Sequence, residues 1–381
     1  MRELLSFCPS GPDWQVPWAA LDERYEWIRR MADCPQDANY HSEGNVWIHT
    51  RMVCEELTAL PGFRALPEAE RQLVFLASLL HDVAKPDCTK HEDDGRITSK
   101  GHSGRGERLV RGLLWELGAD MDTRETVARL VRVHQVPFFL IDDDQAVAIA
   151  YRLSLTVRCD MLSLVAEADA RGRRCKDPAD QQRMLDNVEL FRELCREHDC
   201  LDKPRVFPSN HARFEYFRKA WRDPNYNAYD DTDLEVIVMC GLPAAGKDTW
   251  IRENVLAKAP DTPVVSLDSI RAELGVSPGD NQSPVIKHAR EQARICLRAK
   301  QTFVWNATNL IRDHRNAIVD LCVDYNARVL LVYVDAAETT LRSRNAARED
   351  SVPSRALNRM IERWTVPDPA EAHEVCWIQA T

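Results

Sequence analysis

The chain has 381 residues, enough for two domains, and its 44% hydrophobic and 29% charged residues are typical of a folded protein with a core. Its net charge of −10 argues against a generally basic coat for nucleic acid, although residues 234–381 are nearly neutral. No apolar run reaches the ~18 residues of a membrane span, and the first residues lack a secretory layout. We therefore expect a cytoplasmic protein that contacts no membrane. The twelve scattered cysteines form no Cys-x-x-Cys pair, which favours buried thiols over disulfides or a zinc cage.

Residues 1–202 are predicted to be helical, and no strand is convincing before residue 230. The segment LPEAERQLVFLASLLHDVAK, residues 66–85, has apolar residues at helical spacing, and Pro86 is expected to close the helix. GRGERLVRGLLWELG, TRETVARLVRVH and DMLSLVAEADARGR continue this pattern. The first part of the chain is therefore expected to be an all-α domain.

Polar residues interrupt these helices at places where burial would be costly. His81 and Asp82 are adjacent at the end of an apolar segment. Burying these two side chains is costly unless they find ion-pair or hydrogen-bond partners or bind a metal. Taken singly, each histidine is better explained as an isolated polar residue than as a metal ligand. Taken together, six residues offer nitrogen and oxygen ligands suited to Mn, Fe, Co, Ni or Zn: His49, His81, Asp82, His102, His134 and Asp169. Asp160 is an alternative to Asp169.

Two cationic residues follow these ligands closely. Lys85 comes three residues after Asp82, and Arg173 comes four residues after Asp169. Either side chain could neutralise a phosphate oxygen, and either could equally be a solvated surface charge.

Residues 20–180 resemble the HD-domain metal phosphohydrolases. His49, His81–Asp82 and Asp169 match the ligands of that superfamily, and His102 and His134 match the extra histidines of its two-metal members. GHSGRGE and EADARGR also resemble the HD domain attached to bacterial tRNA nucleotidyltransferases. One metal would then lie on His49, His81, Asp82 and Asp169, and a second would share Asp82 with His102 and His134. Two such cations activate water and stabilise charge at phosphorus, with Mn²⁺, Co²⁺ or Ni²⁺ as the expected ions.

Residues 203–233 are rich in aromatic residues, Pro and Asn, which predicts a connector with one short helix around residues 211–221. After it the pattern changes. LEVIVMC, PVVSLD, FVWNAT and RVLLVYVD are short apolar runs that alternate with helical stretches. Residues 234–381 are therefore expected to form an α/β domain with a parallel sheet and crossover helices.

The segment GLPAAGKDTW follows the first of these strands. Its two glycines and lysine have the spacing of a phosphate-binding loop between a strand and a helix, but Asp248 stands where Ser or Thr would hold Mg²⁺. Either Asp248 or Thr249 could ligate the ion. The residues expected to bind ATP, or another nucleoside triphosphate, are Gly241, Leu242, Pro243, Ala244, Ala245, Gly246, Lys247, Asp248 and Thr249.

Further polar residues follow the later strands. Asp268 could accept a hydroxyl proton, with Arg271 one turn away to hold an acceptor phosphate. Thr308 and Asn309 end another strand, where ligands bind in open α/β sheets. Arg344 and Arg348 are placed to close over nucleotide phosphates. Arg290, Arg294 and Arg298 form a stripe that could follow a phosphate backbone or simply be a solvated helix face.

This series resembles the 5′-hydroxyl polynucleotide kinases. Lys247 matches their loop lysine, Asp268 their general base, Arg271 their acceptor-phosphate arginine, and RNAAREDSVP their lid with Arg344 and Arg348. ATNL resembles their acceptor-side Asp-Thr-Asn segment with Ala307 in place of Asp, so Asn309 is the safer match.

Taken whole, the chain resembles the bifunctional bacterial HD–polynucleotide kinase enzymes that heal nucleic-acid ends. That resemblance implies removal of a 2′-phosphate, or opening of a 2′,3′-cyclic phosphate, at one RNA or DNA end. It also implies ATP-dependent phosphorylation of a 5′-hydroxyl with Mg²⁺, for later joining by a polynucleotide ligase. Two other hypotheses stay open: an HD nucleotidase fused to a small-molecule kinase, and an HD hydrolase regulated by nucleotide sensing.

Overall fold

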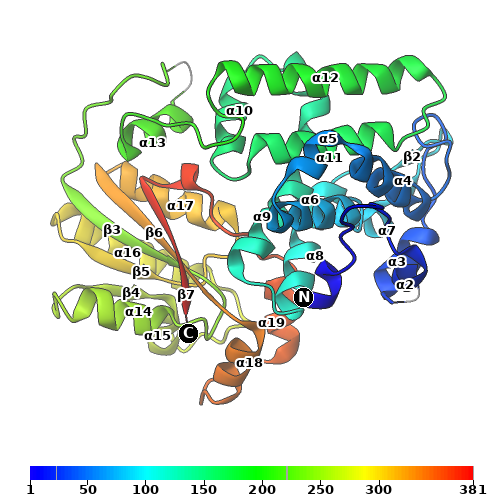
Figure 1. Cartoon of the computed structure of the whole chain (residues 1–381). Helices are drawn as coiled ribbons and strands as arrows, with labels where there is room; N and C mark the ends of the chain where they lie inside the picture. The colour runs from blue at the N-terminus through cyan, green and yellow to red at the C-terminus, as the bar shows by residue number, and fades with distance from the viewer. Residues whose placement is uncertain (23, 220–221, 381) are drawn as a thin grey trace. The chain divides into compact units, whose positions relative to one another are not determined.

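The computed structural model describes residues 1–22, 24–219 and 222–380, and the chain divides into two compact units, Met1–Arg205 and Val206–Thr381. Figure 1 shows the first unit in blue to green and the second in green to red. No helix in the described part of the chain combines the length and apolar character that a membrane crossing needs.

The first unit is helical apart from a two-strand hairpin that the sequence did not predict, β1 Lys90–His91 and β2 Ile97–Thr98. Its helices are α1 Arg2–Leu5, α2 Trp18–Asp22, α3 Glu26–Ala32, α4 Val46–Ala59, α5 Pro61–Ala65, α6 Glu68–Leu80, α7 Lys85–Cys88, α8 His102–Glu116, α9 Met121–Val133, α10 Ala146–Ser154, α11 Cys159–Arg171 and α12 Pro178–Glu197, with the short 3₁₀ turns η1 Val136–Phe138 and η2 Leu140–Asp142.

The core of this unit forms where α6 and α11 pack against α4 and α9. Every residue of α6 from Val74 to Leu80 is buried, so this mostly apolar segment is covered on all sides rather than on one face. The helix ends at Leu80, earlier than the predicted run to Lys85. Pro86 does not close it, because Pro86 lies in the first turn of the next helix, α7, where its missing N–H costs nothing.

The second unit contains the predicted alternation of strands and helices. Its elements are α13 Asn210–Arg218, β3 Leu234–Cys240, α14 Lys247–Ile251, the π-helical turn η3 Arg252–Leu256, β4 Val264–Ser266, α15 Leu267–Leu274, α16 Ser283–Arg298, β5 Phe303–Asn306, α17 Arg312–Val323, β6 Ala327–Ala336, α18 Glu338–Ala346, α19 Ser354–Ile361, η4 Pro369–Glu371 and β7 Glu374–Ala380.

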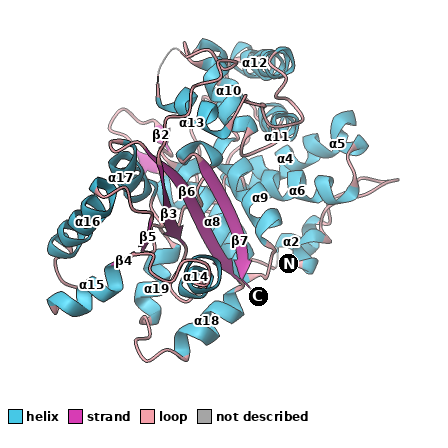
Figure 2. Cartoon of the chain, turned by 90° about the vertical axis from the view of Figure 1, so that its left-hand side faces the viewer, coloured by secondary structure: helices cyan, strands magenta, loops and turns pink. Residues whose placement is uncertain are grey.

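Its five strands form one sheet in the order β4-β5-β3-β6-β7, and each neighbouring pair is parallel. Figure 2 shows them in magenta. The central strands β3 and β6 are almost fully buried, as expected of a sheet covered on both faces. Because the strands are parallel, the segments that follow β3, β4 and β5 emerge at the same edge of the sheet.

Most of the segment predicted as a connector belongs to the second unit. Helix α13 packs through Phe214, whose ring centroid lies 4.0 Å from that of His373, next to β7. The His211 and His373 rings stack 5.5 Å apart, and Arg213 donates to the His373 carbonyl oxygen at 2.9 Å. The helix ends at Arg218, and Trp221, where we had expected its end, lies outside the described residues. This segment therefore completes the packing of the α/β unit.

Candidate functional site

The structure brings the six predicted metal ligands of the first unit together in its core. His49 comes from α4 and Asp169 from α11, while His81 and Asp82 follow the end of α6. His102 begins α8 and His134 follows α9. All six side chains are buried. Five separate elements of the chain thus converge on one point.

Asp82 lies at the centre of this group. Its Oδ2 atom is 3.1 Å from His81 Nε2 and 3.8 Å from His49 Nε2. Its Oδ1 atom is 3.3 Å from His102 Nε2 and 3.9 Å from His134 Nε2. Each oxygen of one carboxylate therefore faces a different pair of imidazoles, which is the arrangement expected of an aspartate shared by two cations.

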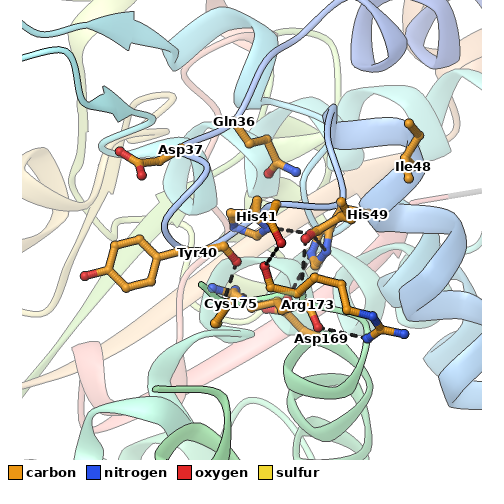
Figure 3. A network of polar contacts seen from close by, with 12 residues as sticks. Gln36, Asp37, Tyr40, His41, Ile48, His49, Asp169, Arg173 and Cys175 are labelled. Atoms are coloured by element: carbon orange, nitrogen blue, oxygen red, sulfur yellow. Dashed lines mark hydrogen bonds and ion pairs between the residues drawn. The ribbon is translucent and has the colours of Figure 1, made fainter. Parts of the chain in front are cut away.

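Asp169 closes the other side of the group. Its Oδ1 atom lies 3.1 Å from His49 Nε2, and Arg173 binds both of its oxygens at 3.0 and 2.8 Å. Figure 3 shows Arg173 and Asp169 beside His49. Arg173 lies just past the end of α11, rather than on the helix as predicted, but the i,i+4 spacing still brings the two side chains together.

Backbone carbonyl groups orient three of the histidines. The Nδ1 atoms of His81, His102 and His134 lie 2.7 to 2.8 Å from the carbonyl oxygens of Ser78, Ser99 and Val131. A proton on each Nδ1 leaves Nε2 with its lone pair toward the centre, the tautomer that a metal ligand needs.

Burial and charge set the protonation of the group. Burial, with the nearby His81, lowers the pKa of His134 to about 3, so His134 is neutral at physiological pH. Burial opposes ionisation of Asp82, but His81 and Lys85 outweigh it and hold the pKa of Asp82 well below its usual range. Burial also disfavours charge on His81, but Asp82 outweighs it and raises the pKa of His81. Cation binding would displace that proton.

Among the described residues, His81 Nε2, His134 Nε2 and both carboxylate oxygens of Asp82 make no well-formed hydrogen bond, and their contacts are ion pairs with one another and with Lys85. Such atoms are costly to bury unless something binds them. Overlapping trios of these ligands also have donor atoms within 4.8 Å of one another. The nitrogen and oxygen donors, their orientation and their missing partners all fit divalent transition-metal ions.

The two predicted cations line a cavity of about 750 Å³ beside this group. Although α6 has ended, Lys85 still reaches back, and its Nζ atom lies 2.7 Å from Asp82 Oδ2 and donates to Gln36 at 2.7 Å. Arg173 lines the same cavity. Asp160, the alternative ligand, instead binds Arg158 at 2.6 Å.

Sequence reasoning missed two residues next to His49. Glu43 Oε1 lies 3.0 Å from His49 Nδ1 and 2.9 Å from His41 Nδ1. The ring centroids of His41 and His49 are 4.6 Å apart, and Figure 3 shows these two side chains next to each other. Glu43 therefore orients His49 from behind, as carboxylates do for metal-bound histidines. Both residues precede α4 in a loop without periodicity, and the polar cluster HSEG close to His49 was the available signal.

In the second unit, the glycine loop follows β3 and leads into α14. Gly241 has φ +142°, and a Cβ atom there would overlap the carbonyl oxygen of Val334. Gly246 has φ +109°, just before Lys247 begins the helix. Both positions therefore require glycine. The loop presents backbone N–H groups at a helix N-terminus, which is the geometry of a phosphate-binding loop.

The side chains of this loop contact their own surroundings. Lys247 donates to the carbonyl oxygens of Gly241 and Leu242 at 3.0 and 2.9 Å, and burial lowers its pKa despite nearby Asp248. Asp248 accepts from Asn306, at the end of β5, at 2.7 Å. Thr249 is exposed on the first turn of α14. Of the two candidate Mg²⁺ ligands, Asp248 is thus the one held in place by a neighbouring strand.

Asp268 and Arg271 form an ion pair with each other. The predicted strand PVVSLD ends at Ser266, because Ser266 caps α15 by accepting from the Ser269 N–H, so Asp268 lies in the first turn of that helix. The side chain of Asp268 is 82% exposed, and Arg271 also donates to Gln282 at 3.2 Å. An exposed carboxylate is accessible to a substrate hydroxyl.

Thr308 and Asn309 lie under the glycine loop. Gly241 N–H donates to the Thr308 carbonyl oxygen at 2.9 Å, and the buried Asn309 side chain donates to the Met239 carbonyl oxygen at 2.7 Å. Arg315, which binds the Asn309 carbonyl oxygen at 3.0 Å, is in turn held by Glu371. The structure thus places Asn309 as a support for the loop. Its predicted contact with substrate stays a prediction.

The two lid arginines lie at different places. Arg344 belongs to α18 and lies near Gly246, whereas Arg348 comes after the helix has ended at Ala346. The following loop is held by Asn345, which exchanges two hydrogen bonds with Val352. On α16, Arg294 and Arg298 both pair with Glu291, as a solvated helix face would.

Residues 40–170 match the family model of the HD domain, and residues 236–367 match a family model described as an AAA domain. The multifunctional CCA protein of Ralstonia nicotianae is 30% identical over 155 residues, which is 38% of this chain and 33% of that protein. The match therefore spans about a third of the length of this curated relative.

Two solved structures are similar to the chain at 16% identity. A candidate kinase from Chloroflexus aurantiacus J-10-fl has a TM-score of 0.33 and covers 39% of this chain and 86% of its own. A sugar kinase from Janibacter sp. HTCC2649 has a TM-score of 0.31 and covers 38% and 85%. Over the residues that the family models match, the chain joins a helical HD domain to an AAA domain whose strands form a parallel sheet.

Proposed function

We propose that the chain heals nucleic-acid ends. The HD domain would hydrolyse a 2′-phosphate or 2′,3′-cyclic phosphate, and the P-loop domain would transfer the γ-phosphate of ATP to a 5′-hydroxyl. The observation that carries the proposal is the pairing in one chain of a histidine–aspartate group with unsatisfied donor atoms and a glycine loop built for phosphate. These two kinds of site perform complementary chemistry on phosphate esters.

In the HD domain, divalent ions would be held by His49, His81, Asp82, His102, His134 and Asp169. When bound, such ions offset negative charge at phosphorus and lower the pKa of water. The chain's own contribution is to hold the substrate. Lys85 lines the cavity and can pair with a phosphate oxygen, and Arg173, which lines the same cavity, fixes Asp169.

In the kinase domain, the loop N–H groups and Lys247 would bind the β- and γ-phosphates of ATP, with Mg²⁺. Lys247 must leave the two carbonyl oxygens that it now contacts. Asp268 would accept the proton of the attacking 5′-hydroxyl, and Arg271 would bind the adjacent phosphate. Arg344 lies close enough to Gly246 to cover the nucleotide.

The test uses purified protein and two substrates. One is a 5′-hydroxyl oligonucleotide with ATP labelled at the γ-phosphate, and the other is an oligonucleotide ending in a 2′-phosphate, assayed over a panel of Mn²⁺, Co²⁺, Ni²⁺ and Mg²⁺. We expect label transfer to the first and phosphate release from the second. Transfer to a sugar or nucleoside but to no oligonucleotide would favour a small-molecule kinase. Nucleotide binding without any transfer would favour a sensor.

His81→Ala and Asp268→Ala separate the two reactions. His81→Ala should abolish phosphate release and leave label transfer intact, and Asp268→Ala should do the reverse. Loss of both activities in either variant would contradict two independent sites.

A further inference from the structure

The cavity beside the histidine–aspartate group has a wall that the proposed chemistry does not use. Its volume of about 750 Å³ is within the ~300–1,000 Å³ of small-molecule sites, and is more than a phosphate group alone requires. Lys85 and Arg173 line the part of the cavity next to the histidine–aspartate group, called the ligand group below. Phe138 and Phe139, from the turns after α9, line another part of it. The space therefore extends from the ligand group to an aromatic surface.

The two phenylalanines are held very differently. Phe138 is 2% exposed and packs with Ala166, Ala170 and Val188 in a hydrophobic cluster. Phe139 is 66% exposed, and its ring meets that of Phe138 edge-on, with the centroids 6.2 Å apart. A single exposed phenylalanine is common on protein surfaces. This one stands on a fixed aromatic neighbour and faces a cavity.

A continuous series of contacts joins this aromatic surface to the ligand group. Asp169 binds Arg173 through two hydrogen bonds, and the Arg173 guanidinium carbon lies 5.2 Å from the Phe138 ring centroid. Phe138 in turn supports Phe139. A substrate whose phosphate lies against Arg173 would therefore bring its next chemical group to the aromatic surface.

The charges around the cavity limit what that group can be. Its lining contains four cations, Lys85, Lys100, Arg173 and Arg183, and three carboxylates, Asp37, Asp142 and Asp180. Arg183 also lies 3.4 Å from Asp180. A surface that followed several backbone phosphates would have a large excess of positive charge. The nearly balanced lining instead suits one phosphate and one planar, uncharged group.

We propose that this cavity binds the terminal nucleotide of the substrate, with Phe139 stacked on its base and Lys85 and Arg173 at its phosphate. The proposal rests on the proposed phosphohydrolase function and names the substrate class of that site. Phe139 is then a specificity-determining residue. Because every base has a flat aromatic face, the site accepts all four terminal bases to a similar degree.

The test compares two RNA oligonucleotides that end in a 2′-phosphate and differ only in the terminal base, which is present in one and absent in the other. The wild-type protein should hydrolyse the 2′-phosphate of the base-bearing end with a kcat/KM about 10-fold higher than that of the abasic end, as expected for one stacked base. Phe139→Ala should abolish this preference, mainly through KM, and leave activity on the abasic end unchanged.

Three variants make the comparison specific. Phe139→Trp should keep the preference because it retains a ring, and Phe139→Leu should lose it although it retains apolar bulk. Leu190→Ala removes another exposed apolar side chain, on α12 and outside the cavity lining, and should change nothing. Thermal unfolding of each variant should match wild type, because Phe139 is mostly exposed.

Equal cleavage of both ends by the wild-type protein, or an unchanged preference in Phe139→Ala, would overturn the stacking proposal and leave the hydrolase function standing. If the wild-type protein with Mn²⁺, Co²⁺ or Ni²⁺ cleaves neither end, the proposed function of the HD domain itself fails.

Discussion

In the HD domain the six predicted ligands are buried and already face one another, whereas in the P-loop domain the predicted catalytic side chains contact each other or their own loop. Asp82 is buried and faces four histidines and Lys85, while Asp268 is exposed and paired with Arg271. A metal site needs its donors fixed in advance, because burying them unpaired is costly. A kinase site must exchange contacts when nucleotide and acceptor arrive.

The largest effect should follow from removing the central carboxylate. Asp82→Asn keeps the shape of the side chain but removes the charge that both pairs of histidines share. We expect the rate of phosphate release to fall by well over ~100-fold. Substitution of residues that only support the ligands of a metal site already lowers affinity or activity by about 10- to 100-fold. The kinase rate should not change. Metal content of the purified variant, measured by mass spectrometry, checks the cause.

A matched control is Asp87→Asn, a partly buried aspartate on α7 that pairs with Arg30 and Arg105 instead of the ligand group. It should retain its metal. Equal metal content in the wild type and Asp82→Asn would contradict a fixed metal site.

The kinase side of the comparison is tested by Asp268→Ala. Loss of a general base typically lowers kcat by ~10²–10⁴-fold, and we expect a change in this range for label transfer. The variant should unfold at the same temperature as wild type, because the side chain is exposed. Asp261→Ala, another exposed aspartate in the same domain, serves as the control. A kinase rate unaffected by Asp268→Ala would remove Asp268 from the mechanism.

A smaller effect should distinguish the two candidate Mg²⁺ ligands. Asn306 orients Asp248, while Thr249 has no comparable contact among the described residues. Asp248→Ala should raise the Mg²⁺ concentration for half-maximal kinase activity by about 10-fold. Asn306→Ala should raise it by less, because Asn306 would act on the ion only by orienting Asp248. Thr249→Ala should leave it unchanged. Titration of Mg²⁺ at saturating ATP measures this, and the reverse order would assign the ion to Thr249.

The smallest effect concerns stability rather than catalysis. Burial, with His211 nearby, lowers the pKa of His373 to about 3, against about 6.5 in an unfolded chain. Between these values the unfolded state binds the extra proton, so the contribution of His373 to the free energy of unfolding should be lost as pH drops below about 6.5. His373→Gln should make the fall in stability with pH less steep in denaturant titrations, while His134, whose pKa is also lowered to about 3, keeps part of it. His314→Gln, at an exposed histidine on α17, should not.

The predictability of the two sites from sequence differs for a physical reason. His81 and Asp82 were conspicuous because they follow a segment that is otherwise apolar, where a charge needs a partner, whereas Asp169 was found through the resemblance of EADARGR to HD domains. Glu43 and His41 were missed because they lie in a loop, where polar residues are ordinary. Periodicity cannot distinguish a loop residue that orients a ligand from one that is solvated.

In the α/β unit, the alternation of strands and helices was predictable, whereas local boundaries were not. Ser266 ends β4 early by capping α15, which moves Asp268 from a strand onto a helix. Arg348 falls beyond the end of α18. Such boundaries depend on single hydrogen bonds that apolar periodicity does not encode. The exposed Phe139 had no signal in sequence, because its significance comes from the cavity that it lines.

The most direct test is one RNA oligonucleotide with a 5′-hydroxyl at one end and a 2′,3′-cyclic phosphate at the other. It would be incubated with the full chain, ATP, Mg²⁺ and Mn²⁺, and its two ends followed by mass spectrometry after fragmentation. We predict that the 5′ end gains one phosphate and that the cyclic phosphate opens. Asp82→Asn should block only the second change and Asp268→Ala only the first. An oligonucleotide unchanged at both ends would contradict end healing.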